Sequence, residues 1–211
     1  MKAYRILAAG AATAALLINP TPSTMATASA DGCPDVEVVF ARGTSEPPGL
    51  GRVGDGLVNA LRARTSRSVG AYAVNYPATY DFGRAADGAN DASGHVMWMM
   101  ENCPGTRLVL GGYSQGAAII DIIAAAPVPG FGFTAPLPPQ AADHVAAVAV
   151  FGNPSNKLGQ PLTNSPVYGF KTIDLCTDGD PVCSPGRNFA AHSGYTPGMT
   201  NQAAGFVAGL L

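Results

Sequence analysis

The sequence is poor in charged residues, and its few charges are nearly balanced. Only 12% of its 211 residues are charged, and 12 lysines and arginines stand against 14 aspartates and glutamates. A nucleic-acid-binding protein needs a clustered basic face, which this composition does not provide. Beyond the N-terminal segment, no apolar run approaches the roughly 20 residues that a transmembrane helix requires. We therefore expect no nucleic-acid partner and no membrane span in the mature chain.

Histidine and tryptophan are also scarce, and the sequence has no metal-site pattern. The chain has three histidines and one tryptophan, Trp98. No cysteine, histidine or acidic cluster has the spacing of a metal site. A groove lined with aromatic side chains for sugars is less expected in a chain with a single tryptophan. We expect no metal and no cofactor.

The first 30 residues have the organisation of a secretory signal peptide. Lys2 and Arg5 precede the apolar segment ILAAGAATAALLI, and a stretch rich in Pro, Ser and Thr ends in ATASA. This ending fits the Ala-x-Ala rule, so cleavage is expected after Ala30 and a single domain over 31–211. A retained membrane anchor is disfavoured because the apolar segment is short and is broken by an Asn-Pro pair. We expect a secreted monomer, either released or retained at the cell envelope.

The chain contains four cysteines, which in an exported protein are expected to form disulfides. Cys176 and Cys183 are close enough in the sequence to close one small loop. Cys33 and Cys103 would tie the mature N-terminus to the middle of the chain. Four cysteines allow three pairings, and the spacing alone does not choose among them.

Apolar segments alternate with helical patterns along the mature chain. Apolar runs on both faces of successive strands indicate a parallel sheet covered by helices on both sides, a three-layer α/β architecture. In such sheets functional residues lie beyond the carboxyl ends of the strands. The expected strands are 36–44, 69–77, 107–114, 144–154 and 167–176, and the expected helices are 50–66, 92–103, 115–126 and 199–211.

The segment RLVLGGYSQGAAIIDIIAAA places Ser114 between Gly112 and Gly116, where a strand pattern gives way to a helical one. This is the G-x-S-x-G nucleophile elbow in its strand-to-helix context. The alternative is an ordinary glycine-rich turn of a phosphate-binding fold, but no phosphate-binding pattern accompanies this turn. The N–H of Gln115 would lie at a helix N-terminus and face a developing oxyanion. Ser114 is the predicted nucleophile.

A serine nucleophile needs a base, and the three histidines can be compared by position. His95 lies inside a helical pattern before Ser114. His144 begins an apolar strand at the opposite edge of the sheet. His192 follows the last strand in NFAAHSGY, a loop that can fold back over the edge that carries Ser114. His192 is therefore the predicted base.

The catalytic acid of an α/β-hydrolase follows the nucleophile and precedes the histidine. Asp121 is expected to face away from the active edge, and Asp143 lies at the wrong end of a strand. Asp174 falls within a strand pattern and is expected to be structural. Asp178 and Asp180 both lie in CTDGDPVC, just beyond that strand, and composition does not decide between them.

Four motifs in order, FARGT, GYSQG, CTDGDPVC and AHSGY, follow a cysteine near the mature N-terminus. In this respect the chain resembles the cutinase family of serine esterases. It is most similar to the secreted cutinase-like proteins of mycobacteria and related actinobacteria. The resemblance covers about residues 33–211. It implies an α/β-hydrolase-type three-layer sandwich around a mostly parallel five-stranded sheet, without a large lid domain.

The same resemblance assigns roles that the residues alone leave open. It implies that Asp180 is the acid and Asp178 a turn residue, and it pairs Cys33 with Cys103 and Cys176 with Cys183. It also implies an oxyanion hole made by two backbone N–H groups, to which the Thr44 hydroxyl could add a donor. These two N–H groups belong to Thr44 and Gln115.

The expected activity is hydrolysis of short- to medium-chain fatty acyl esters through an acyl-enzyme on Ser114. The segment 126–143, longer than in fungal cutinases, is either a flap beside the site or a surface excursion. Residues that either line the acyl pocket or merely pack in the fold are Tyr76, Tyr80, Val182, Phe189 and Ala190.

Other functions remain open on the same scaffold. An acetylxylan esterase and a phospholipase A would use the same triad on another ester. An acyltransferase would resolve the acyl-enzyme with an alcohol in place of water. A catalytically silent envelope protein that binds lipid is a different class, and it would have no need for a complete Ser-Asp-His set.

Overall fold

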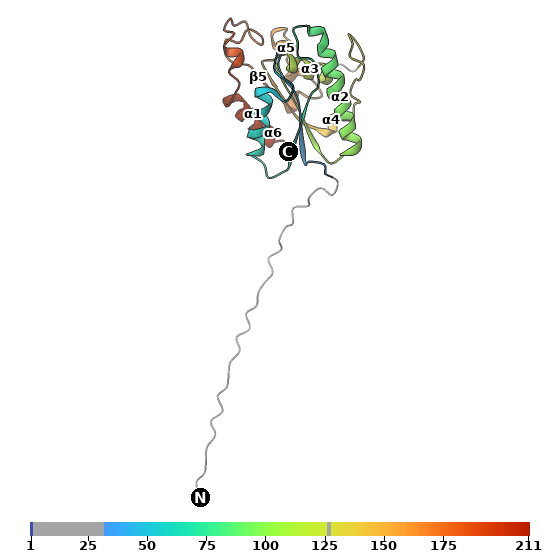
Figure 1. Cartoon of the computed structure of the whole chain (residues 1–211), viewed down its shortest axis with the longest axis vertical. Helices are drawn as coiled ribbons and strands as arrows, with labels where there is room; N and C mark the ends of the chain where they lie inside the picture. Colours follow the sequence, from blue (N-terminus) through green and yellow to red (C-terminus); the bar gives the residue numbers. More distant parts are fainter. Residues whose placement is uncertain (2–31, 126–127) are drawn as a thin grey trace.

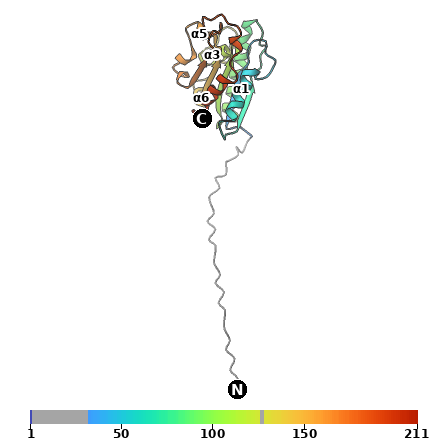
Figure 2. The ribbon, with the colours of Figure 1, turned by 90° about the vertical axis from the view of Figure 1, so that its left-hand side faces the viewer.

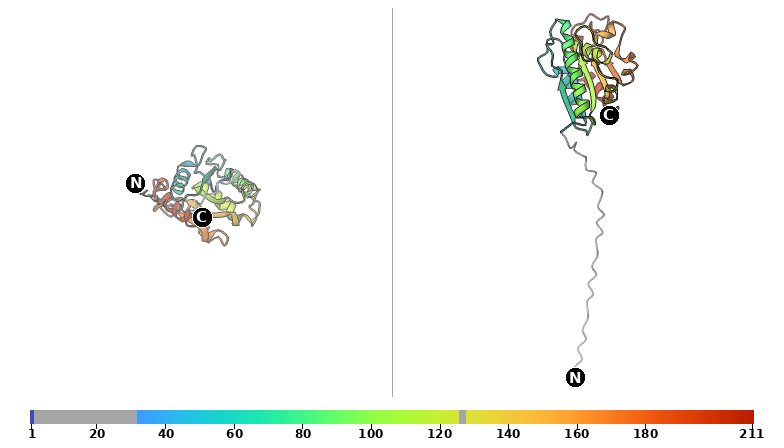
Figure 3. Two further views of the ribbon diagram at one scale, coloured as in Figure 1. Left: turned by 90° about the horizontal axis from the view of Figure 1, so that it is seen from below. Right: turned by 90° about the vertical axis from the view of Figure 1, so that its right-hand side faces the viewer.

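The computed structural model describes Met1, residues 32–125 and residues 128–211, and the helices and strands of the last two ranges form an α/β domain (Figure 1). The expected signal peptide and its cleavage site at Ala30 lie outside the described residues. The domain is built around one twisted sheet, seen from other sides in Figures 2 and 3.

The sheet has five strands in the order β2-β1-β3-β4-β5, and every neighbouring pair is parallel. The predicted parallel five-stranded sheet is thereby confirmed. The last strand is shorter than expected, because residues 169–171 form a 3₁₀ turn before it. The strands are β1 (Val36–Ala41), β2 (Val69–Ala73), β3 (Arg107–Tyr113), β4 (Val145–Phe151) and β5 (Thr172–Leu175).

Helices cover both faces of the sheet, as the apolar strands require. Alternate residues of β1 enter two separate cores: Val38 packs on the side of α1 and α6, and Val39 on the side of α2 and α3. Figure 1 shows α1 and α6 on one side of the sheet and α2 on the other. The helices are α1 (Gly51–Arg62), α2 (Ala85–Asn102), α3 (Gln115–Ala125), α4 (Ala141–His144), α5 (Pro154–Lys157) and α6 (Gly198–Ala208).

Helix α2 begins seven residues before the predicted start at residue 92, at Ala85. Its first turns contain small residues that bury themselves against α3, including Gly88 and Ala89. A Cβ atom at Gly88 would lie 2.5 Å from Cδ1 of Ile119. Sequence periodicity misses this part of the helix because close packing here depends on small side chains and not on large apolar ones.

The domain contains two disulfides, and each closes one loop of the chain. Cys33 joins Cys103, so the segment before β1 is tied to the end of α2, across a sequence separation of 70 residues. Cys176 joins Cys183 across seven residues, directly after β5. This is the pairing that the family resemblance implies. Loop-closure entropy gives roughly 4 kcal/mol for the long bridge and about 2 to 3 kcal/mol for the short one.

Candidate active site

Ser114 lies at the sharp turn between β3 and α3, with a positive φ of 57°. Few residues other than glycine adopt this conformation, so the turn is held by its surroundings. The Ser114 N–H donates to the carbonyl of Phe151, 2.9 Å away. A Cβ atom at Gly112 would lie 2.3 Å from the Gly116 carbonyl oxygen, and one at Gly116 would lie 1.9 Å from that of Ala41. The two glycines are therefore required by close backbone contacts.

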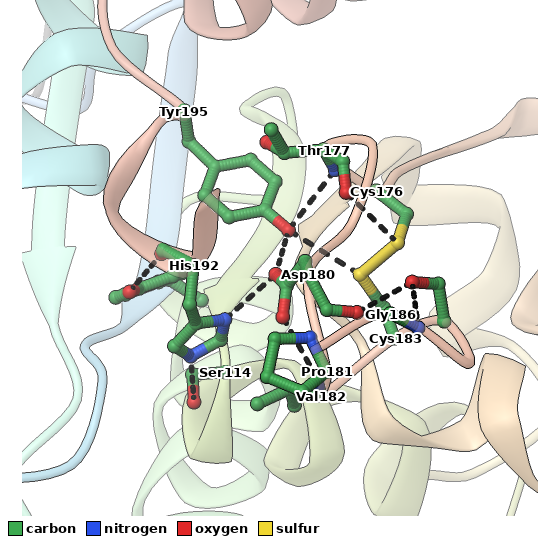
Figure 4. Close-up of polar contacts among 12 residues, drawn as sticks. Ser114, Cys176, Thr177, Asp180, Pro181, Val182, Cys183, Gly186, His192 and Tyr195 are labelled. Carbon is green, nitrogen blue, oxygen red and sulfur yellow. Dashed lines mark hydrogen bonds and ion pairs between the residues drawn. A yellow bond between two sulfur atoms is a disulfide. The ribbon is translucent and has the colours of Figure 1, made fainter. Parts of the chain in front are cut away.

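Ser114, His192 and Asp180 form one hydrogen-bonded chain (Figure 4). The His192 Nε2 atom lies 2.9 Å from Ser114 Oγ, and its Nδ1 atom lies 2.7 Å from Asp180 Oδ2. Asp180 is fully buried. An ionised carboxylate can only accept, so Nδ1 carries the ring proton and leaves Nε2 free to accept the proton of Ser114. The order of nucleophile, base and orienting acid matches that of a serine hydrolase triad.

Hydrogen bonds keep Asp180 ionised in spite of its burial. Burial alone would raise its pKa, but donors from Tyr195, His192 and the Val182 N–H lower it below the ordinary value of 3.8. The Val182 N–H donates to Oδ1 at 2.8 Å, while His192 and the Tyr195 hydroxyl both donate to Oδ2. An ionised acid at this position can offset the positive charge that an imidazole gains during proton transfer.

Tyr195 is a buried member of this network that the sequence did not reveal. Its hydroxyl donates to Asp180 and accepts from the Thr177 N–H at 3.3 Å (Figure 4). An N–H group can only donate, so the single phenolic proton must point at Asp180. Burial, together with the neighbouring carboxylate, raises the pKa of Tyr195 and keeps this proton in place. Tyr195 stands in the AHSGY motif, but a tyrosine there is equally consistent with ordinary packing.

The small disulfide supports the same hydroxyl. Cys183 Sγ lies 3.4 Å from the Tyr195 oxygen, and Cys176 immediately precedes Thr177. Both cysteines are disulfide-bonded, so neither sulfur carries a proton to donate. The disulfide therefore fixes both the Thr177 N–H that donates to the phenol and the Cys183 sulfur beside it. Through the Tyr195 hydroxyl it also helps to position Asp180.

The other candidate acids lie elsewhere. Asp178 is exposed on the turn before Asp180. Asp121 and Asp174 are linked by Asn153, whose Nδ2 donates to a carboxylate oxygen of each at 3.1 Å. Burial raises the pKa of Asp121 to about 6 and also raises that of Asp174. This cluster joins α3, α5 and β5, and neither of its carboxylates contacts His192.

The remaining two histidines are remote from Ser114. His95 on α2 lies 2.5 Å from a carboxylate oxygen of Glu37 and stacks on Tyr72 with the ring centres 3.5 Å apart. His144 ends α4, at the start of β4 and the opposite edge of the sheet from Ser114. Only His192 is within hydrogen-bonding distance of the serine.

Two backbone N–H groups are candidates for an oxyanion hole. Within the described residues, the N–H groups of Thr44 and Gln115 donate to no other group of the protein. Both residues line the pocket that holds Ser114. The Thr44 hydroxyl, which could add a third donor, instead donates to Gln115 Oε1 at 3.1 Å in this structure. The Gln115 amide is held in that orientation because its Nε2 donates to the Thr79 carbonyl at 3.2 Å.

Ser114 and His192 open into a pocket of about 700 Å³, within the usual range for small-ligand sites. Of the residues expected to line it, Tyr80, Val182 and Phe189 do so. None of residues 128–143 contributes to this pocket. The full set is Thr44, Tyr80, Phe82, Ala85, Tyr113, Ser114, Gln115, Ala118, Ile122, Pro154, Val182, Phe189 and His192.

Tyr76 and Ala190 lie outside the pocket, contrary to the sequence-based expectation. Tyr76 is buried, its hydroxyl donates to the Arg42 carbonyl at 2.5 Å, and the Arg42 guanidinium lies over its ring. Ala190 is exposed to solvent at the start of a 3₁₀ turn, without lining the cavity. Phe82 and Ile122 line the pocket in their place, which no sequence pattern predicted.

Comparison with known proteins identifies the family. The model of the Cutinase family matches residues 32–211. The chain belongs to the cutinase family. Over 204 residues it is 61% identical to the phospholipase Culp4 of Mycobacterium tuberculosis, covering 96% of this chain and 89% of that protein. It is 55% identical over 184 residues to the probable carboxylesterase Culp3 of the same species, covering 85% of this chain and 70% of that one.

Solved structures give the same result. An acetylxylan esterase superposes with a TM-score of 0.73 at 28% identity, covering 84% of this cutinase-family chain and 99% of the other. A cutinase of Trichoderma reesei in complex with a phosphonate inhibitor superposes with a TM-score of 0.67 at 32% identity, covering 85% and 78% of the two chains. The chain is thus a carboxylic ester hydrolase with an α/β-hydrolase fold.

Two further findings bear on what this cutinase-family domain contains. Among the residues that the structure describes, no three His, Cys, Asp or Glu side chains come together as metal ligands would. Across the same residues, no helix is both long and apolar enough to cross a membrane.

Proposed function

We propose that this protein is a secreted serine esterase that cleaves short- to medium-chain fatty acyl esters through an acyl-enzyme on Ser114. The observation that carries the proposal is the chain of contacts from Ser114 Oγ through His192 to buried Asp180, at 2.9 and 2.7 Å, at the wall of an apolar pocket. Residues 1–30 would be removed as a signal peptide, and residues 31–211 would form the active domain. The two disulfides fit an oxidising compartment.

In the acylation step, Ser114 Oγ attacks the ester carbonyl carbon while its proton passes to Nε2 of His192. Asp180 holds the imidazole in the required tautomer and offsets its new charge. The carbonyl oxygen becomes an oxyanion, which the N–H groups of Thr44 and Gln115 stabilise. Each such donor contributes roughly 3 kcal/mol to lowering the barrier.

The tetrahedral intermediate then collapses. The bond between the carbonyl carbon and the alcohol oxygen breaks, and His192 gives its proton to the departing alcohol. Water next attacks the acyl-enzyme, with His192 accepting its proton, and a second collapse returns that proton to Ser114. The products are a carboxylic acid and an alcohol, and no other reactant is consumed.

The walls of the pocket support a fatty acyl substrate. Tyr80, Phe82 and Phe189 are 77%, 62% and 77% exposed, although each lines the pocket. Exposed aromatic side chains around a pocket favour an apolar ligand that enters from solvent. A sugar polymer is less well supported, because Trp98 lies on α2 beside His95 and outside the pocket.

A phospholipase A activity is the second candidate. It is favoured by the relative named phospholipase Culp4, at 61% identity over nearly the whole of both chains. The same triad and the same acyl-enzyme would serve, with a lysophospholipid as the leaving alcohol. A catalytically silent lipid-binding protein is disfavoured, since it would not require the serine, base and acid to be in hydrogen-bonding contact.

Hydrolysis of p-nitrophenyl esters from acetate to palmitate by the mature protein tests the proposal. We expect kcat/KM to peak between butyrate and octanoate. The Ser114→Ala variant should lose at least roughly a thousandfold in kcat and keep its circular dichroism spectrum and melting temperature. Turnover that is the same in the variant and the wild type would contradict the proposal.

A further inference from the structure

A second apolar groove adjoins the pocket at Ser114. It has a volume of about 450 Å³ and shares three wall residues with that pocket: Phe82, Ala85 and Ile122. Its far wall is formed by residues 128–131 and Phe133. Every side chain that lines it is apolar, and the remaining lining residues are glycines. The groove therefore suits a hydrocarbon ligand, because none of its side chains can pair with a charge or make a hydrogen bond.

The far wall is held in place by specific contacts. Gly130 and Phe133 exchange two backbone hydrogen bonds of 2.9 Å each, and the Phe133 side chain is 3% exposed in the core. Asn90 on α2 donates to the Gly132 carbonyl at 2.9 Å and accepts from the Thr134 N–H at 2.8 Å. Residues 130–134, which include the far wall of the groove, are thus hydrogen-bonded to one another and to α2.

The rim of the groove presents apolar side chains to solvent. Val128 is 65% exposed and Phe131 is fully exposed, facing outward from the turn that Gly130 and Phe133 close. Phe131 has a positive φ of 50°, an uncommon conformation for an aromatic residue. A solvent-exposed apolar rim beside an apolar groove indicates a binding surface for a lipid-like ligand.

We propose that this groove binds the second acyl chain of a glycerolipid whose first acyl chain lies in the pocket at Ser114. This inference rests on the proposed function, since it takes the ester at Ser114 as the scissile one. The two acyl chains of such a lipid leave neighbouring glycerol carbons side by side. The two cavities are likewise side by side, with Phe82 and Ile122 in their common wall.

The substrate class that follows from the proposal is two-chain glycerolipids, with one chain in each cavity. The reaction is the same hydrolysis: the first chain leaves as a fatty acid, and the second remains esterified to the glycerol of the leaving alcohol. Neither a phosphate nor a sugar would be accommodated in the groove, so the headgroup stays outside it. Diacylglycerols and diacylphospholipids share this arrangement of two chains.

The test uses substrates that are single molecules in solution, below their micelle concentrations. These are 1,2-dihexanoylphosphatidylcholine, 1,2-dihexanoylglycerol, monohexanoylglycerol and p-nitrophenyl hexanoate. The variant is Val128→Asp, which places a carboxylate at the edge of the groove on a side chain that is already largely exposed. The matched control is Leu158→Asp, the same kind of change at a residue that is 76% exposed and lines neither cavity.

We expect wild-type kcat/KM to be higher for at least one two-chain lipid than for monohexanoylglycerol. For that lipid, Val128→Asp should lower kcat/KM roughly tenfold or more, and it should leave the two single-chain substrates within about twofold. Leu158→Asp should change none of them. Comparing the two lipids shows whether the phosphate headgroup matters.

Three results would overturn the inference. The first is a wild type that shows no preference for a second chain, and the second is a Val128→Asp variant that loses activity equally on all four esters. The third comes from repeating the assay above the micelle concentrations: a loss in Val128→Asp that appears only there would make this face a docking surface for lipid aggregates. A wild type that cleaves none of the esters would instead overturn the proposed function itself.

Discussion

Two groups of carboxylates in this protein, one buried and one half-buried, behave in opposite ways. Asp180, after β5, has a lowered pKa and contacts His192. Asp121 and Asp174 are joined by Asn153, and their pKa values are raised, that of Asp121 to about 6. Burial raises the pKa in all three cases, so burial alone does not distinguish an acid that can act from one that only ties elements together.

The difference comes from the groups that face each carboxylate. Asp180 receives hydrogen bonds from a phenol, an imidazole and a backbone N–H, which together outweigh its burial. Asp121 receives hydrogen bonds from Ser155 and Asn153, but the charge of Asp174 works against them. A carboxylate can thus be kept ionised in the interior when enough donors face it, here the Tyr195 hydroxyl first and then His192 and the Val182 N–H.

The largest expected effect separates Asp180 from its neighbour in the sequence. Asp180→Asn should lower kcat about 10⁴-fold, because an amide cannot hold the imidazole in the required tautomer or offset its charge. Asp178→Asn, a matched change on the exposed turn two residues away, should leave kcat within about twofold. The measurement is kcat and KM on p-nitrophenyl butyrate. An inert Asp180→Asn beside a crippled Asp178→Asn would transfer the role to Asp178.

Tyr195→Phe should have an intermediate effect, because it removes one hydroxyl and keeps the buried ring. Asp180 Oδ2 would then accept only from His192, and kcat/KM should fall roughly tenfold. Asp180 would also attract the imidazolium proton more strongly, so the acidic limb of the pH profile of kcat/KM should move to higher pH.

Tyr76→Phe provides the control for this position. It also removes a buried hydroxyl, one that donates to the Arg42 carbonyl away from the triad. It should lower the melting temperature and leave the acidic limb where it is. An acidic limb that stays in place in Tyr195→Phe would show that Tyr195 only packs against the triad.

The smallest expected effect is on the pH dependence of the unfolding free energy, and it comes from Asp121. Its pKa of about 6 lies above its ordinary value of 3.8, so the folded state binds the extra proton between these two pH values. The stability that this proton supplies is fully present below about pH 4 and is lost as the pH rises through 6. Asp121→Asn removes this dependence. The unfolding free energy of Asp121→Asn minus that of the wild type should rise by about 1 to 2 kcal/mol as the pH is raised from 4 to 7, measured by urea unfolding.

The activity of Asp121→Asn serves as its internal control. Because Asp121 does not contact His192, kcat on p-nitrophenyl butyrate should remain near the wild-type value. A free-energy difference that is the same at pH 4 and pH 7 would show that the carboxyl of Asp121 titrates normally. A large loss of kcat would mean that the two groups of carboxylates are coupled.

Local patterns predict the parts of this protein that depend on local geometry. The parallel sheet follows from apolar strands that alternate with helices, and the turn at Ser114 follows from the two glycines that flank it. His192 could be selected because the chain has only three histidines. The choice of Asp180 over Asp178 needed a family resemblance, since both lie in one short loop.

What the sequence does not predict depends on contacts between distant segments. The role of the Tyr195 hydroxyl depends on Thr177 and Asp180, which reach it from the loop after β5. Tyr76 and Tyr80 are four residues apart, yet only Tyr80 lines the pocket. Between them Ala78 has a positive φ of 52°, and this turn redirects the chain in a way that strand alternation does not anticipate.

The most direct test of the central claim is covalent trapping of Ser114. Diethyl p-nitrophenyl phosphate transfers its diethylphosphoryl group to an activated serine oxygen and releases p-nitrophenol. Intact-mass and peptide analysis should find one diethylphosphoryl group per molecule, on the peptide that contains Ser114, in step with the loss of esterase activity. Loss of activity without this modification, or modification at another residue, would contradict the account.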